Sequence, residues 1–236
     1  MIEDRKSQVR ERVWSSLEDI GAVEPGVRGW IPDFRGADAA AQRLAAQPEW
    51  QAARAVKCNP DRAQLAVRRL ALREGKTLYI AVPNLSDERP FLRLDPATLG
   101  SNADSTAEVA EARKLGTAVY ADEVEPLDVV VCGTVAVNRE GVRIGKGAGY
   151  SDLEVALLTD VGAITPGTLV VTTVHPLQVV AESLPSTRHD FTVELIAAPD
   201  EVIRCSRRRI PTTVDFDALP EARIAAMPGL RARATH

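Results

Sequence analysis

The sequence LDVVVCGTVAVNREGVRIGKGAGYSDLE, residues 127–154, joins a strongly apolar run to a turn rich in glycine. Residues 127–137 are the most apolar part of the chain, which is typical of a strand buried on both faces. The glycine run GKGAG, residues 145–149, follows, and residues 152–161 favour a helix. A strand, a glycine turn and a helix in this order indicate an α/β fold.

The same alternation continues on both sides of this stretch and predicts a mostly parallel sheet covered by helices on both faces. Expected helices occupy residues 4–20, 38–46, 61–74, 106–115 and 152–161, with a short one opening at Pro48. Expected strands occupy residues 55–58, 77–82, 127–137, 168–174 and 191–197, with ordered loops at 21–36 and 83–96. We expect one α/β domain over residues 1–204 and a partly disordered C-terminal extension over residues 205–236.

Composition is that of an ordinary globular protein. The 236 residues are 45% hydrophobic and 26% charged, with a net charge of −4, so the whole chain has no field that would attract nucleic acid or an anionic membrane. No apolar run approaches the roughly 18 residues of a spanning helix, and the first six residues are charged, so we expect a cytoplasmic protein. The sequence leaves the oligomeric state open.

The cysteines are three in number and lie far apart in the sequence. Cys58, Cys132 and Cys205 form no C-x-x-C pair, which argues against a zinc site or a redox dithiol. We expect them to be reduced and to pack as small hydrophobic side chains.

The glycine run has the properties of a phosphate-binding turn. Glycines between a buried strand and a helix let main-chain amides approach an anion at the positive end of the helix dipole. Lys146 would add a cation beside those amides. The run matches neither the G-x-G-x-x-G dinucleotide turn nor the G-K-[ST] ending of the P-loop, and a tight turn that needs glycine only for its geometry is the alternative.

The four residues after the run allow two interpretations. Ser151 and Glu154 stand in the S-x-x-E spacing of a capping box, which would make both of them helix caps. Asp152 lies beside the presumed phosphate site, where a carboxylate would hold Mg²⁺ together with phosphate oxygens.

Residues 133–152, GTVAVNREGVRIGKGAGYSD, resemble the signature of the 5-formyltetrahydrofolate cyclo-ligases, in which G-x-R-[LI]-G-[RK]-G-x-G-Y-Y-D follows a strand. Lys6 and Arg10 resemble the K-x-x-x-R pair of that family. Residues 189–194, HDFTVE, resemble its H-D-x-x-[LV]-D motif, and Gln178 fits a glutamine between the two.

The resemblance implies a three-layer αβα fold like that of sugar-phosphate isomerases and CoA transferases. It also implies ATP, Mg²⁺ and a reduced folate as the small-molecule substrate, and conversion of 5-formyltetrahydrofolate to 5,10-methenyltetrahydrofolate. The residues it assigns to ATP are Lys6, Arg10, Arg143, Gly145, Lys146, Gly147, Ala148, Gly149, Tyr150 and Asp152. It implies catalytic roles for Arg143, Lys146 and Tyr150, and metal binding by Asp152 and Glu194.

The chain also departs from the family pattern. Ser151 replaces the second tyrosine, Asn138 and Glu194 replace aspartates, and Leu153 replaces a basic residue. Residues 57–61, KCNPD, stand where the family carries a glutamate for the pterin ring. This pattern resembles the methenyltetrahydrofolate synthetase domain-containing branch of the family.

Three functions therefore remain open at this point: a folate cyclo-ligase or a paralogue acting on a related ligand, a nucleotide- or folate-binding regulatory protein without catalysis, and an enzyme for another phosphorylated substrate. His175 and His189 are either structural or lie at the site, and Trp30 is the tryptophan expected to border a pocket. Arg207, Arg208 and Arg209 are expected to lie in a solvated tail.

Overall fold

The larger of two β-sheets forms the middle layer of the molecule. The computed structural model describes residues 1–206 and 208–231, and all statements below refer to these residues. In spatial order the strands of this sheet are β11 (Val202–Arg204), β10 (Leu195–Ala197), β8 (Leu169–Thr173), β5 (Val129–Cys132), β1 (Ala55–Cys58), β2 (Thr77–Ala81), β3 (Phe91–Leu94) and β4 (Thr117–Val119). Strands β10, β8, β5, β1 and β2 run parallel to one another. Antiparallel pairs extend the sheet at both ends, β11 on β10 at one end and β3 on β2 followed by β4 on β3 at the other.

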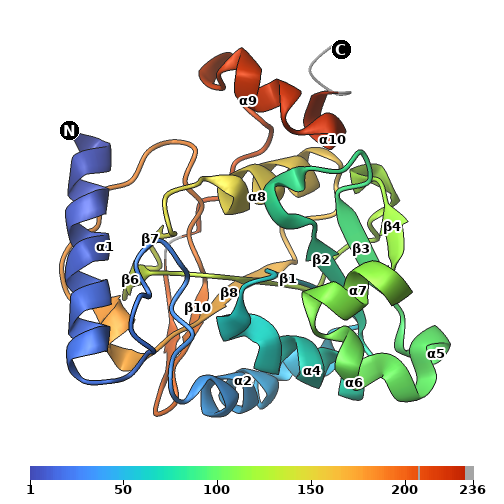
Figure 1. The fold of residues 1–236 in the computed structure, drawn as a ribbon, viewed down its shortest axis with the longest axis horizontal. Coiled ribbons are helices and arrows are strands. Elements are labelled where there is room, and N and C mark those ends of the chain that lie inside the picture. The colour runs from blue at the N-terminus through green and yellow to red at the C-terminus, as the bar shows by residue number, and fades with distance from the viewer. Residues whose placement is uncertain (207, 232–236) are drawn as a thin grey trace.

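Helices cover both faces of this sheet, which gives the three-layer αβα fold that was expected (Figure 1). The helices are α1 (Ile2–Asp19), α2 (Ala37–Ala45), α3 (Pro48–Ala52), α4 (Leu65–Arg73), α5 (Pro96–Leu99), α6 (Ala103–Thr106), α7 (Val109–Leu115), α8 (Tyr150–Asp160), α9 (Glu221–Ala225) and α10 (Pro228–Arg231). Figure 1 shows α2 and α4 on one side of the sheet and α8 on the other. None of these helices is both long and apolar enough to span a membrane.

Strand β5 supplies side chains to both cores because successive residues of a strand point to opposite faces. Val129 and Val131 pack in the core under α2 and α4, whereas Val130 and Cys132 pack in the core under α8. Burial on both faces explains why this strand is apolar at every position.

The apolar run is divided between two sheets, so the expected single strand over residues 127–137 is wrong in its extent. The chain leaves the large sheet after Cys132 and enters a small sheet of order β7 (Arg143–Ile144), β6 (Ala136–Asn138) and β9 (Val179–Val180). Helix α1 packs on this small sheet, with Val9 and Val13 in the same core as Ala136. The glycine run therefore begins directly after β7, in the small sheet on which α1 packs.

Several boundaries also differ from the sequence prediction. The expected loop at 83–96 contains β3, and β4 was not expected at all. A 3₁₀ turn, Arg62–Gln64, precedes α4, and the strand expected at 191–197 is regular only in β10.

The segment after β11 packs against the body of the protein. Met227 and Leu230 are completely buried in the core beneath α8. Arg208 binds the Glu194 carboxylate, and Arg209 Nε donates to the carbonyl of Asp190 over 2.9 Å. These contacts differ from the solvated tail expected for Arg208 and Arg209, whereas Arg207 and residues 232–236 lie outside the described residues.

Candidate functional site

The glycine run lies above the carboxyl ends of the parallel strands, where α/β sheets usually bind ligands. Asp61 follows β1, and Gly133 follows β5. A Cβ atom on Gly133 would lie 2.9 Å from Asp61 Oδ2, so only glycine allows this close approach. The loops after these strands thus form the floor of the site.

The glycine run itself offers main-chain donors. Within the described residues, none of the amides of residues 145–149 donates a hydrogen bond to the protein. Gly147 has φ of 110° and Gly149 has φ of 69°, which are conformations that suit glycine. Gly149 is the N-cap of α8, so the run ends at the positive end of a helix. This arrangement fits an anion.

Lys6 and Arg10 approach the run from α1, as the sequence motif implied. Lys6 Nζ lies 2.8 and 2.7 Å from the two carboxylate oxygens of Asp190. Arg10 Nε donates to the Gly145 carbonyl over 2.8 Å, and its Nη1 lies 2.7 Å from Glu3 Oε1. Both cations are more than nine-tenths buried.

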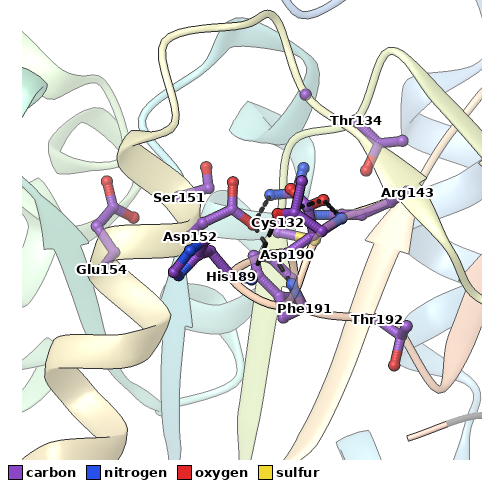
Figure 2. A network of polar contacts seen from close by, with 12 residues as sticks. Cys132, Thr134, Arg143, Ser151, Asp152, Glu154, His189, Asp190, Phe191 and Thr192 are labelled. Atoms are coloured by element: carbon purple, nitrogen blue, oxygen red, sulfur yellow. Dashed lines mark hydrogen bonds and ion pairs between the residues drawn. The ribbon is translucent and has the colours of Figure 1, made fainter. Parts of the chain in front are cut away.

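Arg143 is the most deeply buried cation of the site. Its side chain is 2% exposed, and its guanidinium lies 4.1 Å from the ring centroid of Phe191. Its Nη2 lies 3.4 Å from Asp152 Oδ1, while its buried Nε has no hydrogen-bond partner among the described residues. A buried guanidinium with one long ion pair is under-compensated, so it favours a bound anion. Figure 2 shows Arg143, Asp152, Asp190 and Phe191 in one network.

Lys146, within the glycine run, contacts the loop after β1 and the loop at residues 21–36. Its Nζ is 3.0 Å from Asp61 Oδ1 and 5.7 Å from the ring centroid of Trp30. Trp30, which is 64% exposed, comes from the loop at residues 21–36 and borders a cavity, as expected.

Asp152 and Asp190 are the carboxylates that pair with Arg143 and Lys6. Burial raises the pKa of Asp152, and Arg143 opposes that shift only in part. Burial also disfavours the charged form of Asp190, but hydrogen bonds from Lys6 and Thr187 outweigh it and lower the pKa of Asp190.

Glu194 does not join this pair. Its carboxylate is bound by Arg208 and lies 3.3 Å from the Val170 amide nitrogen. No group of three or more His, Cys, Asp or Glu side chains suited to a metal occurs in the part of the chain that the structure describes. Mg²⁺ needs only one or two protein carboxylates when phosphate oxygens complete its coordination, so Asp152 and Asp190 fit such an ion.

Two cavities meet at the run. A small one of about 80 Å³ is lined by Lys6, Arg10, Arg143, Asp152 and Asp190. A large one of about 670 Å³ lies on the side of Trp30, Asp61 and Lys146. A narrow space lined by Asp61, Lys146 and Arg143 lies between the large cavity and the charged one.

The capping-box interpretation of Ser151 and Glu154 is wrong. Helix α8 begins at Tyr150, so Ser151 is its second residue, and no side chain caps it. Ser151 Oγ accepts a hydrogen bond from Asn59 Nδ2 over 2.8 Å. Glu154 is buried and ion-paired with the completely buried Lys57.

The buried network of Lys57, Asn59, Ser151 and Glu154 holds the loop after β1 against helix α8. Lys57 Nζ also donates to Asn59 Oδ1 over 2.6 Å, so Lys57 connects β1 and the following loop to α8. The ion pair joins residues 97 positions apart, and no local sequence pattern reveals it.

Two departures from the family motif have structural roles. Asn138 Oδ1 accepts the Val142 amide over 3.0 Å and closes the β6–β7 hairpin, and Ser151 takes part in the buried network. Gln178 and His175 are also structural: Gln178 Nε2 donates to the Thr134 carbonyl, and His175 Nδ1 accepts the Leu177 amide.

Sequence reasoning missed three further residues at the site. Asp190 was visible in the H-D motif, and Asp61 in the KCNPD stretch, but neither was assigned a role. Arg223 had no sequence signal, yet it donates to the Ala148 carbonyl from the C-terminal segment.

Comparison with known proteins identifies the family of the chain. The sequence profile of the 5-formyltetrahydrofolate cyclo-ligase family matches residues 2–199. The chain belongs to this family. The NMR structure of Aquifex aeolicus 5,10-methenyltetrahydrofolate synthetase superposes with a TM-score of 0.55 at 22% identity. The superposition covers 89% of this chain and 98% of that chain, and it supports the fold alone.

Curated relatives carry the name methenyltetrahydrofolate synthase domain-containing protein. The Mus musculus protein is 37% identical over 235 residues, covering 96% of this chain and 62% of the relative. The Homo sapiens protein is 35% identical over 211 residues, covering 86% of this chain and 54% of the relative. The chain therefore spans little more than half the length of these cyclo-ligase family relatives.

Proposed function

We propose that the chain is an ATP- and Mg²⁺-dependent cyclo-ligase that converts 5-formyltetrahydrofolate to 5,10-methenyltetrahydrofolate, or a paralogue acting on a related reduced folate. The observation that carries the proposal is the under-compensated Arg143 facing the free amides of residues 145–149. Electrostatic clamping of a transferring phosphoryl group is what this chemistry requires.

The triphosphate would lie in the small charged cavity. Lys6, Arg10 and Arg143 supply three cations there, and the amides of the glycine run supply neutral donors. Asp152 and Asp190 would hold Mg²⁺ against the phosphate oxygens, and the ion would neutralise charge that develops during transfer.

The folate would lie in the large cavity. Its volume of about 670 Å³ is within the usual range for small-molecule pockets. Trp30 offers a flat face for a ring, and carboxylates such as Asp33 and Asp61 can accept hydrogen bonds from the amino group and ring N–H of a pterin. Asp61 would thus bind the pterin ring in place of the glutamate that the family carries for it.

The reaction then has two steps. The γ-phosphoryl group moves from ATP to the formyl oxygen, and ADP leaves. The second folate nitrogen attacks the activated formyl carbon and loses its proton to solvent, and phosphate departs with that oxygen to give the methenyl product. Lys146 lies between the two cavities and would hold the transferring phosphoryl group.

A binding protein without catalysis is the second candidate. It is favoured by the departures from the family motif, since Asn138 and Ser151 have structural roles in this chain while the amides of residues 145–149 stay available.

Turnover separates the two candidates. Protein with MgATP and 5-formyltetrahydrofolate should increase the near-ultraviolet absorbance of methenyltetrahydrofolate, and Lys146→Ala should abolish the increase. Lys114→Ala is the matched control, because Lys114 is an exposed lysine on α7. Thermal stabilisation by ATP or folate without turnover at high protein concentration would instead support the binding protein.

A further inference from the structure

The C-terminal segment, residues 208–231, forms the outer wall of a third cavity beside the glycine run. This cavity has a volume of about 230 Å³. Helix α8 contributes Leu153 to its inner wall, and the C-terminal segment contributes Val214 and Leu219. The cavity meets the small charged one, because Gly149, Asp152 and Asp190 line both of them.

Specific contacts fix the outer wall to the glycine run. The Arg223 guanidinium donates to the Ala148 carbonyl and lies 5.3 Å from the ring centroid of Tyr150. Nη2 of Arg188, the residue before His189, lies 2.6 Å from Oδ2 of Asp215 in the C-terminal segment. Residues 208–231 lie outside the range 2–199 that the family profile matches, so this wall is an addition to the family domain.

The order of the cavities determines how a nucleotide can lie. The narrow space lined by Lys146 and Arg143 separates the large cavity from the charged one, whereas the third cavity shares Asp190 with the charged one. A phosphoryl donor must direct its terminal phosphate toward the acceptor, which the proposed function places in the large cavity. Its other end must therefore leave the charged cavity on the side of Asp190.

We propose that the third cavity binds the nucleoside end of the nucleotide, with the C-terminal segment as its outer wall, an assignment that rests on the proposed function. Leu153, Val214 and Leu219 offer apolar contacts to the faces of a base. His189 and Asp215 on the rim offer polar atoms to ribose hydroxyls or to the edge of the base. Inorganic triphosphate would use the charged cavity and leave this one empty.

Filling the third cavity tests the assignment. Ala218 lines the cavity but is exposed, so Ala218→Trp places a bulky ring there with little effect on folding. Thr213→Trp is a second variant of the same kind, since Thr213 is also exposed and lines the cavity. Ala222→Trp is the matched control, because Ala222 is exposed on α9 outside the residues that line the cavity. Calorimetry with MgATP and with magnesium tripolyphosphate measures the affinity of each variant, and thermal melting without ligand verifies its fold.

We expect either cavity-filling variant to weaken MgATP binding by about tenfold or more and to leave tripolyphosphate binding within about twofold of wild type. The control should bind both ligands as the wild type does. Binding of MgATP unchanged in both folded variants would overturn the nucleoside assignment and leave the proposed function standing. Failure of the wild type to bind either ligand would overturn the proposed function, and the assignment with it.

Discussion

The buried ion pair between Lys57 and Glu154 should dominate the stability of the site. The Lys57 side chain is 0% exposed and the Glu154 side chain 5%, so removing either partner leaves an uncompensated buried charge. Such a loss costs about 3–5 kcal/mol. Because domains of this kind are stable by roughly 5–15 kcal/mol, Lys57→Met should remove a large share of the free energy of unfolding.

Replacing both partners should cost much less. In Lys57→Met/Glu154→Leu no charge is buried, and the main penalty is the unpaired Asn59 Oδ1, worth about 1–3 kcal/mol. Urea denaturation of the two single variants and the double variant gives the coupling energy. Lys114→Met is the control, because its exposed ion pair with Glu111 contributes only about 0–1 kcal/mol. The reasoning is refuted if Lys57→Met costs no more than Lys114→Met, or if the double variant is less stable than both single variants.

Three other predictions concern charge and reactivity. Lys146→Ala should lower the unfolding free energy by less than about 1 kcal/mol, since Lys146 is one-third exposed, but it should reduce the thermal shift produced by MgATP. Asp190→Asn should lower the free energy of unfolding above about pH 4, the ordinary pKa range of an unfolded aspartate. The difference from wild type should vanish as the pH falls through the lowered pKa of folded Asp190, and urea denaturation across this pH range measures it. Burial raises the pKa of Cys58 to about 11, so a thiol reagent at pH 8 should leave Cys58 unmodified in the folded protein and modify it in denaturant. Mass spectrometry of the peptides measures the modification, and equal rates for Cys58 in the folded and the denatured protein would contradict the prediction.

Much of the fold could be predicted because its signals are local. The valines of residues 129–131 and the alternation of apolar and glycine-rich stretches indicate a parallel sheet with helices on both faces, and this was confirmed. The short antiparallel strands β3 and β4 were missed because three or four residues beside charged loops carry little periodic signal.

The candidate site was harder to predict because its partners are distant in the sequence. The cations of α1 and the glycine run were predicted from motifs, and the structure brings Lys6, Arg10, Arg143 and Asp152 to one cavity. The capping box failed because Gly149, with its left-handed backbone, starts α8 earlier than the S-x-x-E spacing requires. Pairing of Glu154 with Lys57 depends on the folded arrangement of β1 against α8, which no spacing within either element encodes.

The loops of the candidate site lie beyond the carboxyl ends of the parallel strands. The turns at the amino ends of these strands therefore lie on the other side of the sheet. The connections there, such as the turn at Gly75 between α4 and β2 and the exposed turn at Gly162 after α8, have open space around them. Insertions, affinity tags or fluorescent reporters attached at the amino ends of the strands should therefore leave the proposed ligand binding unchanged. That side of the protein is suited to immobilisation in the assays above.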